Sequence, residues 1–306
     1  MIVIRLIGGL GNQMFQYALG KALALKNDTK LILDLTLLED HSSMDQSVVH
    51  RNFDLDIFSV NFDFASTQMI EYFNGKNRKT YFGKAFNRIR NILTKNRLII
   101  EKDRFYNPQI SNLIGSKCLV GSWQSPNYFE SFRETLLKEF TFKAEYINLT
   151  SFSFYQDQIK TSINTVGLHV RRGDYVTNRY YNELLGVLPK SFYTEAIELL
   201  KKKFKKMSIF VFSDDIKWCE QNLEFEFITI FIANEKSKKG VASDMKLMSL
   251  CEHQIISNSS FAWWAAWLNK NDNKKVIAPK SWVNSKHLND PQVHAKDIIP
   301  DSWIQI

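Results

Sequence analysis

The stretch Val166-Gly-Leu-His-Val-Arg-Arg-Gly-Asp-Tyr175 joins an apolar run to two arginines, a glycine and an acid. The apolar run predicts a buried strand, and ligands of parallel sheets bind where such strands end. Arginine carries a rigid fork of donors that matches phosphate oxygens two at a time. If the backbone stays extended, Arg171 and Arg172 point to opposite faces, so one meets a ligand while the other braces the loop through Asp174. A purely structural arginine–aspartate pair is the competing interpretation.

The second half of the chain alternates predicted strands with predicted helices. The strands are Thr165–Val170, Ser208–Phe212, Phe227–Phe231, Gln254–Ser257 and Lys275–Ala278, and the helices are Ser191–Phe204, Ile216–Asn222, Asp244–Cys251 and Phe261–Leu268. This alternation is typical of a doubly wound parallel sheet. Residues that follow the strands of such a sheet meet at one edge, so we expect Arg171, Asp214 and Asn258 to lie together.

The first half opens with a β-α-β pattern. It consists of a strand over Met1–Ile7, a tight turn over 8–13, a helix over Gln13–Leu25 and a strand over Lys30–Leu35. No linker rich in proline, glycine or serine separates this half from the next. The change of pattern near residues 146–158 therefore sets the expected boundary, which gives domains of residues 1–150 and 151–306.

The composition is that of a globular protein with an anionic partner. Its 40 Lys and Arg exceed its 32 Asp and Glu, a net charge of +8 that favours a nucleotide, a nucleic acid or a membrane surface. Cys118, Cys219 and Cys251 lack the spacing of a zinc site and are expected to be reduced and buried. Neither a cleavable leader nor a run long enough to span a membrane is present, so we expect a cytoplasmic protein.

The segment Gly8-Gly-Leu-Gly-Asn-Gln13 fits either a structural turn or a loop that lets the backbone approach a ligand. A dinucleotide fingerprint is one version of the ligand loop. Gly9 and Gly11 would begin it, and Asp34 stands where an acid would bind a ribose. Met14 occupies the place of the third glycine, however, which counts against this version.

Two other segments place polar groups after predicted strands. The acids of Phe212-Ser-Asp-Asp215 either cap the next helix or bind a ribose, and a metal would need more oxygen donors than this pair supplies. The small residues of Ser257-Asn-Ser-Ser260 can cap a helix and present hydroxyls and amides to a phosphate. The three tryptophans that follow are expected in the core rather than stacked on a base; they are Trp263, Trp264 and Trp267.

Four segments taken together closely resemble the α-1,2-fucosyltransferase family. They are Gly8-Gly-Leu-Gly-Asn-Gln-Met-Phe-Gln-Tyr17, His169-Val-Arg-Arg-Gly-Asp174, Phe212-Ser-Asp-Asp215 and Ser257-Asn-Ser-Ser-Phe-Ala-Trp-Trp264. The resemblance runs in order over nearly the whole chain. The His-x-Arg-Arg-x-Asp element is also shared with α-1,6- and protein O-fucosyltransferases.

The resemblance implies an α/β fold of the GT-B-like type, in which two Rossmann-type domains face a central cleft. Residues 1–150 would be the acceptor-side domain and residues 151–306 the GDP-fucose-binding domain. The implied reaction is inverting transfer of L-fucose from GDP-L-fucose to the 2-hydroxyl of a terminal β-galactoside, without metal or cofactor. The acceptor would be an oligosaccharide such as a lipid-linked O-antigen repeat, and the protein would be bacterial.

The resemblance also implies roles for individual residues. The GDP-fucose-binding residues would be His169, Arg171, Arg172, Asp214, Asp215, Asp244, Asn258, Ser259, Ser260 and Phe261. In the acceptor-side domain, the loop residues would be Gly9, Gly11, Asn12 and Gln13. Arg171 would hold the departing pyrophosphate, with Arg172 assisting, and Asp244 would hold the guanine edge or the ribose. Asn12 and Asp174 are the other catalytic candidates, although the sequence does not identify a carboxylate as the catalytic base.

Three alternatives stay open. They are a fucosyltransferase that forms α-1,6 or protein O-linked bonds, a nicotinamide-dependent oxidoreductase, and a non-catalytic binding protein. Binding of nucleic acid is not expected, because it would need basic and aromatic residues interleaved on exposed strands. The basic segments 76–104 and 201–206 suit either peripheral contact with anionic lipid or a solvated surface.

Overall fold

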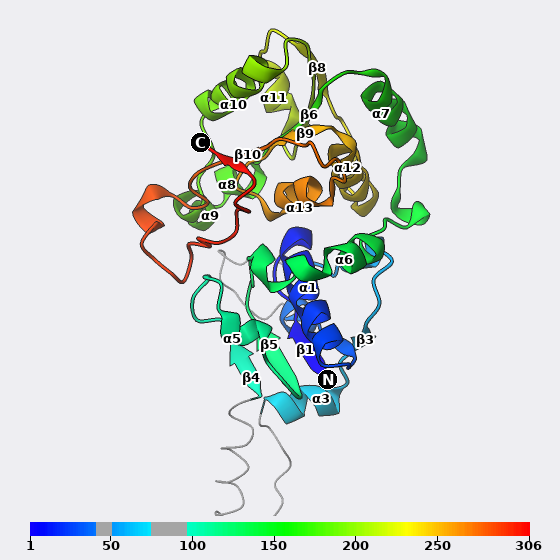
Figure 1. The fold of residues 1–306 in the computed structure, drawn as a ribbon, viewed down its shortest axis with the longest axis vertical. Coiled ribbons are helices and arrows are strands. Elements are labelled where there is room, and N and C mark those ends of the chain that lie inside the picture. The colour runs from blue at the N-terminus through cyan, green and yellow to red at the C-terminus, as the bar shows by residue number, and fades with distance from the viewer. Residues whose placement is uncertain (41–50, 75–96) are drawn as a thin grey trace, which may run out of the picture. The chain divides into compact units, whose positions relative to one another are not determined.

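The computed structural model describes residues 1–40, 51–74 and 97–306. The chain divides into two compact units, each built on its own sheet (Figure 1). Unit 1 comprises residues 1–56 and 60–139, and unit 2 comprises residues 57–59 and 140–306. Most of the basic segment 76–104 lies outside the described residues.

The sheet of unit 1 is parallel, with the described strands in the order β3-β2-β1-β5-β4. The strands are β1 (Ile2–Arg5), β2 (Leu31–Asp34), β3 (Asp63–Phe64), β4 (Leu98–Ile100) and β5 (Lys117–Val120). β1 is central, and its Ile2, Val3 and Ile4 are buried, as expected for a parallel strand covered on both faces. The chain leaves β1 toward β2, whereas β5 lies on the other side, so the strand order reverses between β1 and β5.

Helix α1 (Leu10–Lys26) begins three residues before the predicted helix, which corrects the expected turn over residues 8–13. Only Gly8 and Gly9 form the turn, and Gly11, Asn12 and Gln13 lie in the first helical turn. Gly8 has a φ of +76°, and a Cβ there would press against the Asn12 carboxamide, so this position requires glycine. The other α-helices in the described part of unit 1 are α2 (Thr36–Glu39), α3 (Thr67–Phe73), α5 (Pro108–Ser111) and α6 (Arg133–Glu139).

The sheet of unit 2 is also parallel, with the described strands in the order β11-β10-β9-β6-β7-β8. The strands are β6 (Thr165–Val170), β7 (Ser208–Ser213), β8 (Ile228–Phe231), β9 (His253–Ile255), β10 (Val276–Ala278) and β11 (Ile304–Gln305). The five predicted strands correspond to β6 through β10, and β11 was not predicted. The strand order reverses between β6 and β9, which is where doubly wound sheets bind ligands.

Helices cover both faces of the unit 2 sheet. They are α7 (Leu149–Thr161), α8 (Gly173–Thr177), α9 (Arg179–Leu184), α10 (Lys190–Lys203), α11 (Ile216–Asn222), α12 (Lys238–Leu250) and α13 (Ser260–Leu268). The predicted helices correspond to α10 through α13. α12 begins six residues before the predicted helix, because the Ser237 hydroxyl accepts a hydrogen bond from the Gly240 amide (3.2 Å) and caps the helix there.

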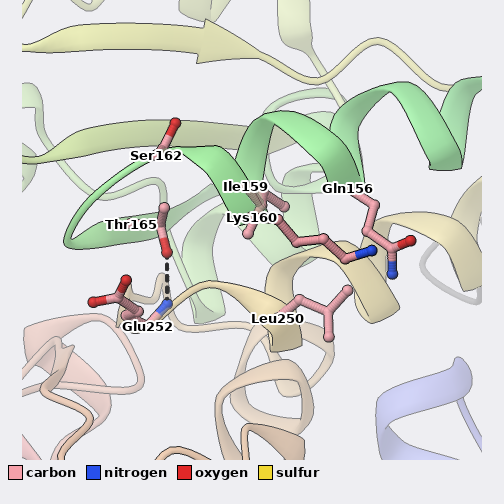
Figure 2. Close-up of a pocket in the computed structure, with 7 residues that line it drawn as sticks. All are labelled: Gln156, Ile159, Lys160, Ser162, Thr165, Leu250 and Glu252. Carbon is pink, nitrogen blue, oxygen red and sulfur yellow. Dashed lines mark hydrogen bonds between the residues drawn. The ribbon is translucent and has the colours of Figure 1, made fainter.

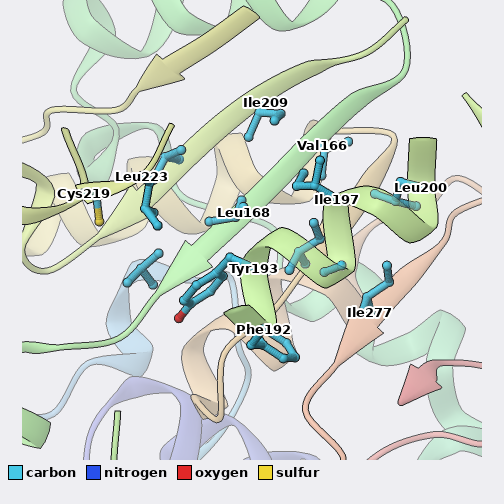
Figure 3. Close-up of a cluster of buried hydrophobic side chains, with 14 of the residues drawn as sticks. Val166, Leu168, Phe192, Tyr193, Ile197, Leu200, Ile209, Cys219, Leu223 and Ile277 are labelled. Atoms are coloured by element: carbon cyan, nitrogen blue, oxygen red, sulfur yellow. The ribbon is translucent and has the colours of Figure 1, made fainter. Parts of the chain in front are cut away.

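Alternate side chains of β6 pack on opposite faces, as the pleat of a strand requires. Val166 and Leu168 pack in a cluster with residues of α10, including Tyr193 and Ile197 (Figure 3). On the other face, a Cβ at Gly167 would press against Met248 of α12, so that helix packs closely against the strand. The prediction of core positions is confirmed for all three tryptophans of α13, and the three cysteines are free and buried, as predicted.

The short segment 57–59 belongs to unit 2, although the chain on either side of it belongs to unit 1. Phe58 forms an antiparallel bridge with Phe142, and its ring also lies 5.2 Å from that of Phe140. The main crossing from unit 1 to unit 2 falls between residues 139 and 140. The position expected for the boundary, after residue 150, lies inside α7.

Candidate active site

Three loops follow the central strands of unit 2 and meet at the carboxyl edge of the sheet. β6 pairs with β7 in a register that sets Val170 opposite Ser213, so Arg171 and Asp214 follow neighbouring strand ends. β9 pairs with β6 on the other side, and Ser257 lies two residues beyond its end. The predicted meeting of these segments is therefore present, at the point where the strand order reverses.

Arg171 lies between two carboxylates. Its Nη2 is 2.5 Å from an oxygen of Asp174, and its Nη1 is 2.8 Å from an oxygen of Asp214. Burial acts to lower the pKa of Arg171, but the charges of Asp214 and Asp174 outweigh burial and raise it. The two ion pairs occupy two of the five guanidinium N–H groups, and the side chain is 24% exposed. Arg171 is thus a fixed cation at the edge of the sheet.

Arg172 turns to different partners. Its Nε donates to Asp215 at 3.0 Å, and its guanidinium carbon lies 3.9 Å from the centre of the Trp218 ring. Its backbone amide donates to Asp214 at 2.8 Å. Asp214 therefore links both arginines, and a Cβ at Gly173 would press against its carboxylate. The arginines diverge as the alternation of an extended strand predicts.

Three carboxylates surround the two guanidinium groups of this cluster. Asp215 also caps α11, because it accepts a hydrogen bond from the amide of Trp218 (3.3 Å), so the capping interpretation applies to this acid. Asp174, in the first turn of α8, accepts from Arg171, which precedes that helix. The acids orient the arginines, and an anionic ligand would bind the remaining guanidinium donors.

His169 is buried at the end of β6, and its Nδ1 lies 2.8 Å from the Ser257 hydroxyl. Burial, together with the charge of Arg171, lowers the pKa of this histidine to about 3. The imidazole is therefore neutral at physiological pH. Its ring centre lies 5.6 Å from that of Phe261 in α13, so the pair joins the end of β6 to the start of that helix.

The segment after β9 contains the buried Asn258, which has a structural role, and the partly buried start of helix α13. The buried Asn258 donates through Nδ2 to the carbonyls of Leu185 (3.0 Å) and Trp282 (3.3 Å), and its own carbonyl accepts from the Tyr175 hydroxyl (3.1 Å). Ser259 is the N-cap of α13 and makes no capping hydrogen bond through its side chain. The amides of the first turn, from Ser260 onward, have no partner within the helix.

Asp244 lies in the middle of α12, and Asn234, which follows β8, donates to its carboxylate at 2.6 Å. Burial raises the pKa of Asp244 to about 7, although the hydrogen bond from Asn234 opposes the shift. A carboxylate with this pKa changes its protonation near neutral pH. Asn234 was not identified from the sequence, and an amide just after a strand end was the signal available.

Two residues of the segment 8–13 in unit 1, Gln13 and Asn12, differ in their surroundings. The buried Gln13 donates to the carbonyls of Gly8 (2.9 Å) and Asn52 (2.8 Å) and accepts from the amide of Asp54 (2.9 Å). It holds the loop in place, and because its side chain is fully buried it is not accessible to a ligand. Asn12, by contrast, is partly exposed and accepts a hydrogen bond from Gln124 at 2.9 Å.

Asp34, the acid considered for a ribose, is engaged within unit 1. It is 1% exposed, forms an ion pair with Arg5 at 2.6 Å, and accepts from the amide and hydroxyl of Thr36 (2.9 and 2.7 Å). A dinucleotide ribose would have to displace these bonds. The geometry gives the nicotinamide alternative no support.

A separate hollow of about 210 Å³ lies at the opposite, amino edge of the unit 2 sheet. Figure 2 shows its lining, which is Gln156, Ile159, Lys160, Ser162, Thr165, Leu250 and Glu252. The amide of Glu252 donates to the Thr165 hydroxyl at 2.9 Å and ties the loop before β9 to the start of β6. Ligands of parallel sheets bind at the other edge, so the arginine cluster is the better candidate.

Within residues 1–40, 51–74 and 97–306, no three His, Cys, Asp or Glu side chains form a group suited to a metal ion. No helix in the same ranges is both long and apolar enough to cross a membrane.

The sequence is similar to those of known glycosyltransferases. The sequence model of glycosyl transferase family 11 matches residues 110–306. The Escherichia coli alpha-1,2-colitosyltransferase is 33% identical, over 100% of this chain and 99% of the relative. The O-antigen biosynthesis glycosyltransferase WbnK, also from Escherichia coli, is 32% identical, over 98% of this chain and 99% of the relative.

The fold comparison extends over both units. A variant of FUT1 from Arabidopsis thaliana, solved in complex with GDP, aligns with a TM-score of 0.52 at 13% identity. The alignment covers 96% of this chain and 72% of the plant chain. It confirms the predicted GT-B-like α/β fold class.

Proposed function

The chain belongs to glycosyl transferase family 11, and from this premise we propose that it transfers L-fucose from GDP-L-fucose to the 2-hydroxyl of a terminal β-galactoside. Its place in the family makes the chain a glycosyltransferase of the fucosyltransferase-like type. The observation that carries the proposal is Arg171, a fixed cation where the strand order of unit 2 reverses. That is the position at which doubly wound sheets bind nucleotides.

In the proposed reaction, the bond between fucose C1 and the pyrophosphate oxygen breaks as a bond from galactose O2 to C1 forms. The acceptor hydroxyl loses its proton, and the configuration at C1 inverts. Negative charge develops on the departing GDP, so a preorganised cation lowers the barrier by about 3 kcal/mol or more. Arg171 suits this role because Asp174 and Asp214 already hold its guanidinium in place.

The nucleotide would be held by residues that follow the strands of unit 2. Arg172 and the start of α13, with Ser259, Ser260 and Phe261, would bind the phosphates together with Arg171. Asp244 would accept hydrogen bonds from the guanine edge in its ionised form. Asp174 would act by positioning Arg171, because its carboxylate is already bound to that guanidinium.

The identity of the donor sugar has a second candidate. The relative at 33% identity is an alpha-1,2-colitosyltransferase, and colitose is fucose without its 3-hydroxyl. We therefore propose GDP-L-fucose as the donor, with GDP-colitose as its direct competitor. Turnover of both donors at equal concentration would decide between them. A preference for GDP-colitose would replace the sugar and leave the rest of the proposal in place.

The acceptor and the cellular setting are proposed on similar grounds. A relative at 32% identity is an O-antigen biosynthesis glycosyltransferase, which favours a cytoplasmic bacterial enzyme acting on a lipid-linked oligosaccharide. Peripheral contact with anionic lipid would suit the basic segment 201–206. However, Lys201 already pairs with Glu226 at 2.5 Å, so part of that charge is neutralised within the protein.

The decisive experiment measures release of GDP from GDP-L-fucose in the presence of lactose, with and without EDTA. We expect release that depends on lactose and is insensitive to EDTA, because protein cations replace a metal. NMR of the product should show an α-1,2 linkage, and an α-1,6 linkage would contradict the proposed acceptor hydroxyl. Tight binding of NAD without binding of GDP would overturn the proposal.

A further inference from the structure

The loop Gly121–Ser125 follows β5 in unit 1, beside the point where that sheet reverses its strand order. Its backbone is unusual at Trp123, which has a φ of +54°. A bulky residue in this left-handed region costs roughly 1–3 kcal/mol, and such costs cluster at functional sites. The surrounding structure must therefore hold the loop in this shape.

Glu101, just beyond β4, holds the loop. Its carboxylate accepts from the amide of Ser122 at 2.6 Å and from the amide of Trp123 at 3.0 Å. A side chain at Gly121 would press against Glu101, so the close approach requires glycine. Burial raises the pKa of Glu101, while the two amides and the charge of Arg104 oppose the shift. Both carboxylate oxygens of Glu101 thus accept hydrogen bonds from the backbone of this loop.

The loop presents two polar side chains whose hydrogen bonds are incomplete. Gln124 is 6% exposed, and its Nε2 donates to Asn12 at 2.9 Å, but its Oε1 has no partner among the described residues. The indole N–H of the buried Trp123 likewise has none among them. A buried polar atom without a partner costs about 1–3 kcal/mol, which a ligand could recover.

Asn12 and Gln124 come from opposite sides of the reversal point. Asn12 lies in the first turn of α1, which follows β1, and Gln124 lies in the loop after β5, so their hydrogen bond joins the two segments that border this point. Both groups are neutral carboxamides, which donate and accept hydrogen bonds as sugar hydroxyls do. The nearby carboxylate of Glu101 already accepts two amides, so the pair offers no charge for an ionic ligand.

We propose that Gln124 and Asn12 form the subsite that binds hydroxyl groups of the acceptor galactoside, and that Glu101 is a positioning residue for this subsite. The inference rests on the proposed function, because it takes a β-galactoside as the acceptor. Trp123, in its left-handed conformation, directs the chain so that Gln124 meets Asn12. The subsite is distinct from the charged cluster that would bind GDP.

The first test replaces Gln124 by methionine, which keeps the length of the side chain and removes its hydrogen bonds. We expect Gln124→Met to raise the KM for lactose about tenfold or more, the equivalent of one lost hydrogen bond. The KM for GDP-L-fucose and its slow hydrolysis without acceptor should stay within about twofold. Gln109→Met is the matched control, because Gln109 lies exposed in the same unit.

The second test asks whether Gln124 meets one particular hydroxyl. Methyl β-galactosides that lack the 3-, 4- or 6-hydroxyl are compared in wild type and in Gln124→Met. One deoxy analogue should bind wild type more weakly than the parent galactoside does. The variant should bind that analogue and the parent galactoside equally, because the contact to this hydroxyl is already gone. If every deoxy analogue costs the same in both proteins, Gln124 touches no hydroxyl of the acceptor and the proposal fails.

The third test concerns Glu101. A glutamine there retains one acceptor oxygen but opposes an amide N–H with its own NH₂ group. Glu101→Gln should therefore raise the KM for lactose and leave kcat and the affinity for GDP nearly unchanged. Equal losses in acceptor and donor constants would mean general damage to the fold and would overturn the positioning role.

The readouts separate this inference from the proposed function. Hydrolysis of GDP-L-fucose and binding of GDP by wild type report on the donor, whereas the lactose KM reports on the subsite. If wild type uses no β-galactoside, ligand-observed NMR with methyl β-galactoside still compares wild type with Gln124→Met. Binding that is equal in the two proteins, or absent from both, would overturn the subsite.

Discussion

The two units carry parallel sheets that each reverse their strand order once, yet the edges at the two reversal points differ in chemistry. In unit 2, two arginines and three aspartates gather there. In unit 1, the side chains that meet across that point are the carboxamides of Asn12 and Gln124, and the Arg51 side chain lies near Gly9. If ligands bind at both points, as we propose, the common backbone plan sets their position and the side chains set whether a charged or a neutral group is bound.

The largest effect is expected at the charged edge. Arg171→Ala should lower kcat/KM for GDP-L-fucose by about 100-fold or more, because it removes a preorganised cation from the departing pyrophosphate. Arg179→Ala is the control, since that side chain is 91% exposed and pairs only on the surface with Glu183. Steady-state rates with lactose would compare the activities of the two variants, and thermal melts would show whether both are folded. Activity above a tenth of wild type in Arg171→Ala would contradict the assignment.

A smaller effect with a different signature is expected at the neutral edge. Asn12→Ala should lower turnover about tenfold while GDP binds nearly as in wild type, since it removes a hydrogen-bonding group from the acceptor side. Initial rates would measure the turnover of Asn12→Ala and wild type, and calorimetry would measure their affinity for GDP. Equal losses in turnover and in GDP affinity would move Asn12 to the donor site and erase the contrast between the edges.

Binding of the donor nucleotide to unit 2 should also respond to pH. The pKa of Asp244 is raised to about 7, so its carboxylate becomes protonated as pH falls through that value and can no longer accept from guanine. Affinity for GDP-L-fucose should weaken by up to about tenfold for each pH unit below the pKa. The pyrophosphate diester of this donor does not titrate in that range. Asp244→Asn should bind more weakly and show no such dependence, and a dependence unchanged in this variant would point to another group.

The Asp244 carboxyl affects the stability of the fold in the opposite direction, because the free energy of unfolding falls as pH rises. Folded Asp244 keeps its proton up to about pH 7, whereas the unfolded chain releases it near the ordinary value of 3.8. Between pH 3.8 and about pH 7 the folded state therefore binds more protons than the unfolded state. The stabilisation from this proton is fully present below pH 3.8 and is lost as pH rises through the folded pKa of about 7. Urea unfolding of wild type and Asp244→Asn at pH 5 and pH 8 would measure the difference. A stability difference that does not change with pH would contradict the shift.

The smallest effect on activity is expected for a buried acid that plays no part in binding. Asp34→Asn breaks an ion pair with Arg5 and should lower the free energy of unfolding by about 1–3 kcal/mol. Rates per folded molecule and GDP affinity should not change. Loss of GDP affinity in this variant would mean that the glycine segment of unit 1 contributes to nucleotide binding after all.

Much of the scaffold of unit 2 was predictable because its strands are continuous apolar runs. β6 has the bounds expected from the sequence, and α11 does too. The short strands β3 and β11 were not predictable, since two residues carry no periodic signal. The early start of α1 was also missed, because glycines at positions 9 and 11 read as a turn, whereas burial of the helix against the sheet outweighs their weak helix propensity.

For the candidate site, the sequence alone determined which chemical groups stand at which strand ends, since apolar periodicity locates the ends and residue type supplies the charge. That was enough to predict the arginine pair, the following acids and the family. Only the tertiary structure decided how these groups are paired. Arg171 lies between Asp174 and Asp214, and Gln124 meets Asn12 across 112 positions of the chain. Such contacts depend on which strands become neighbours, and that is settled by packing of the whole sheet rather than by any local pattern.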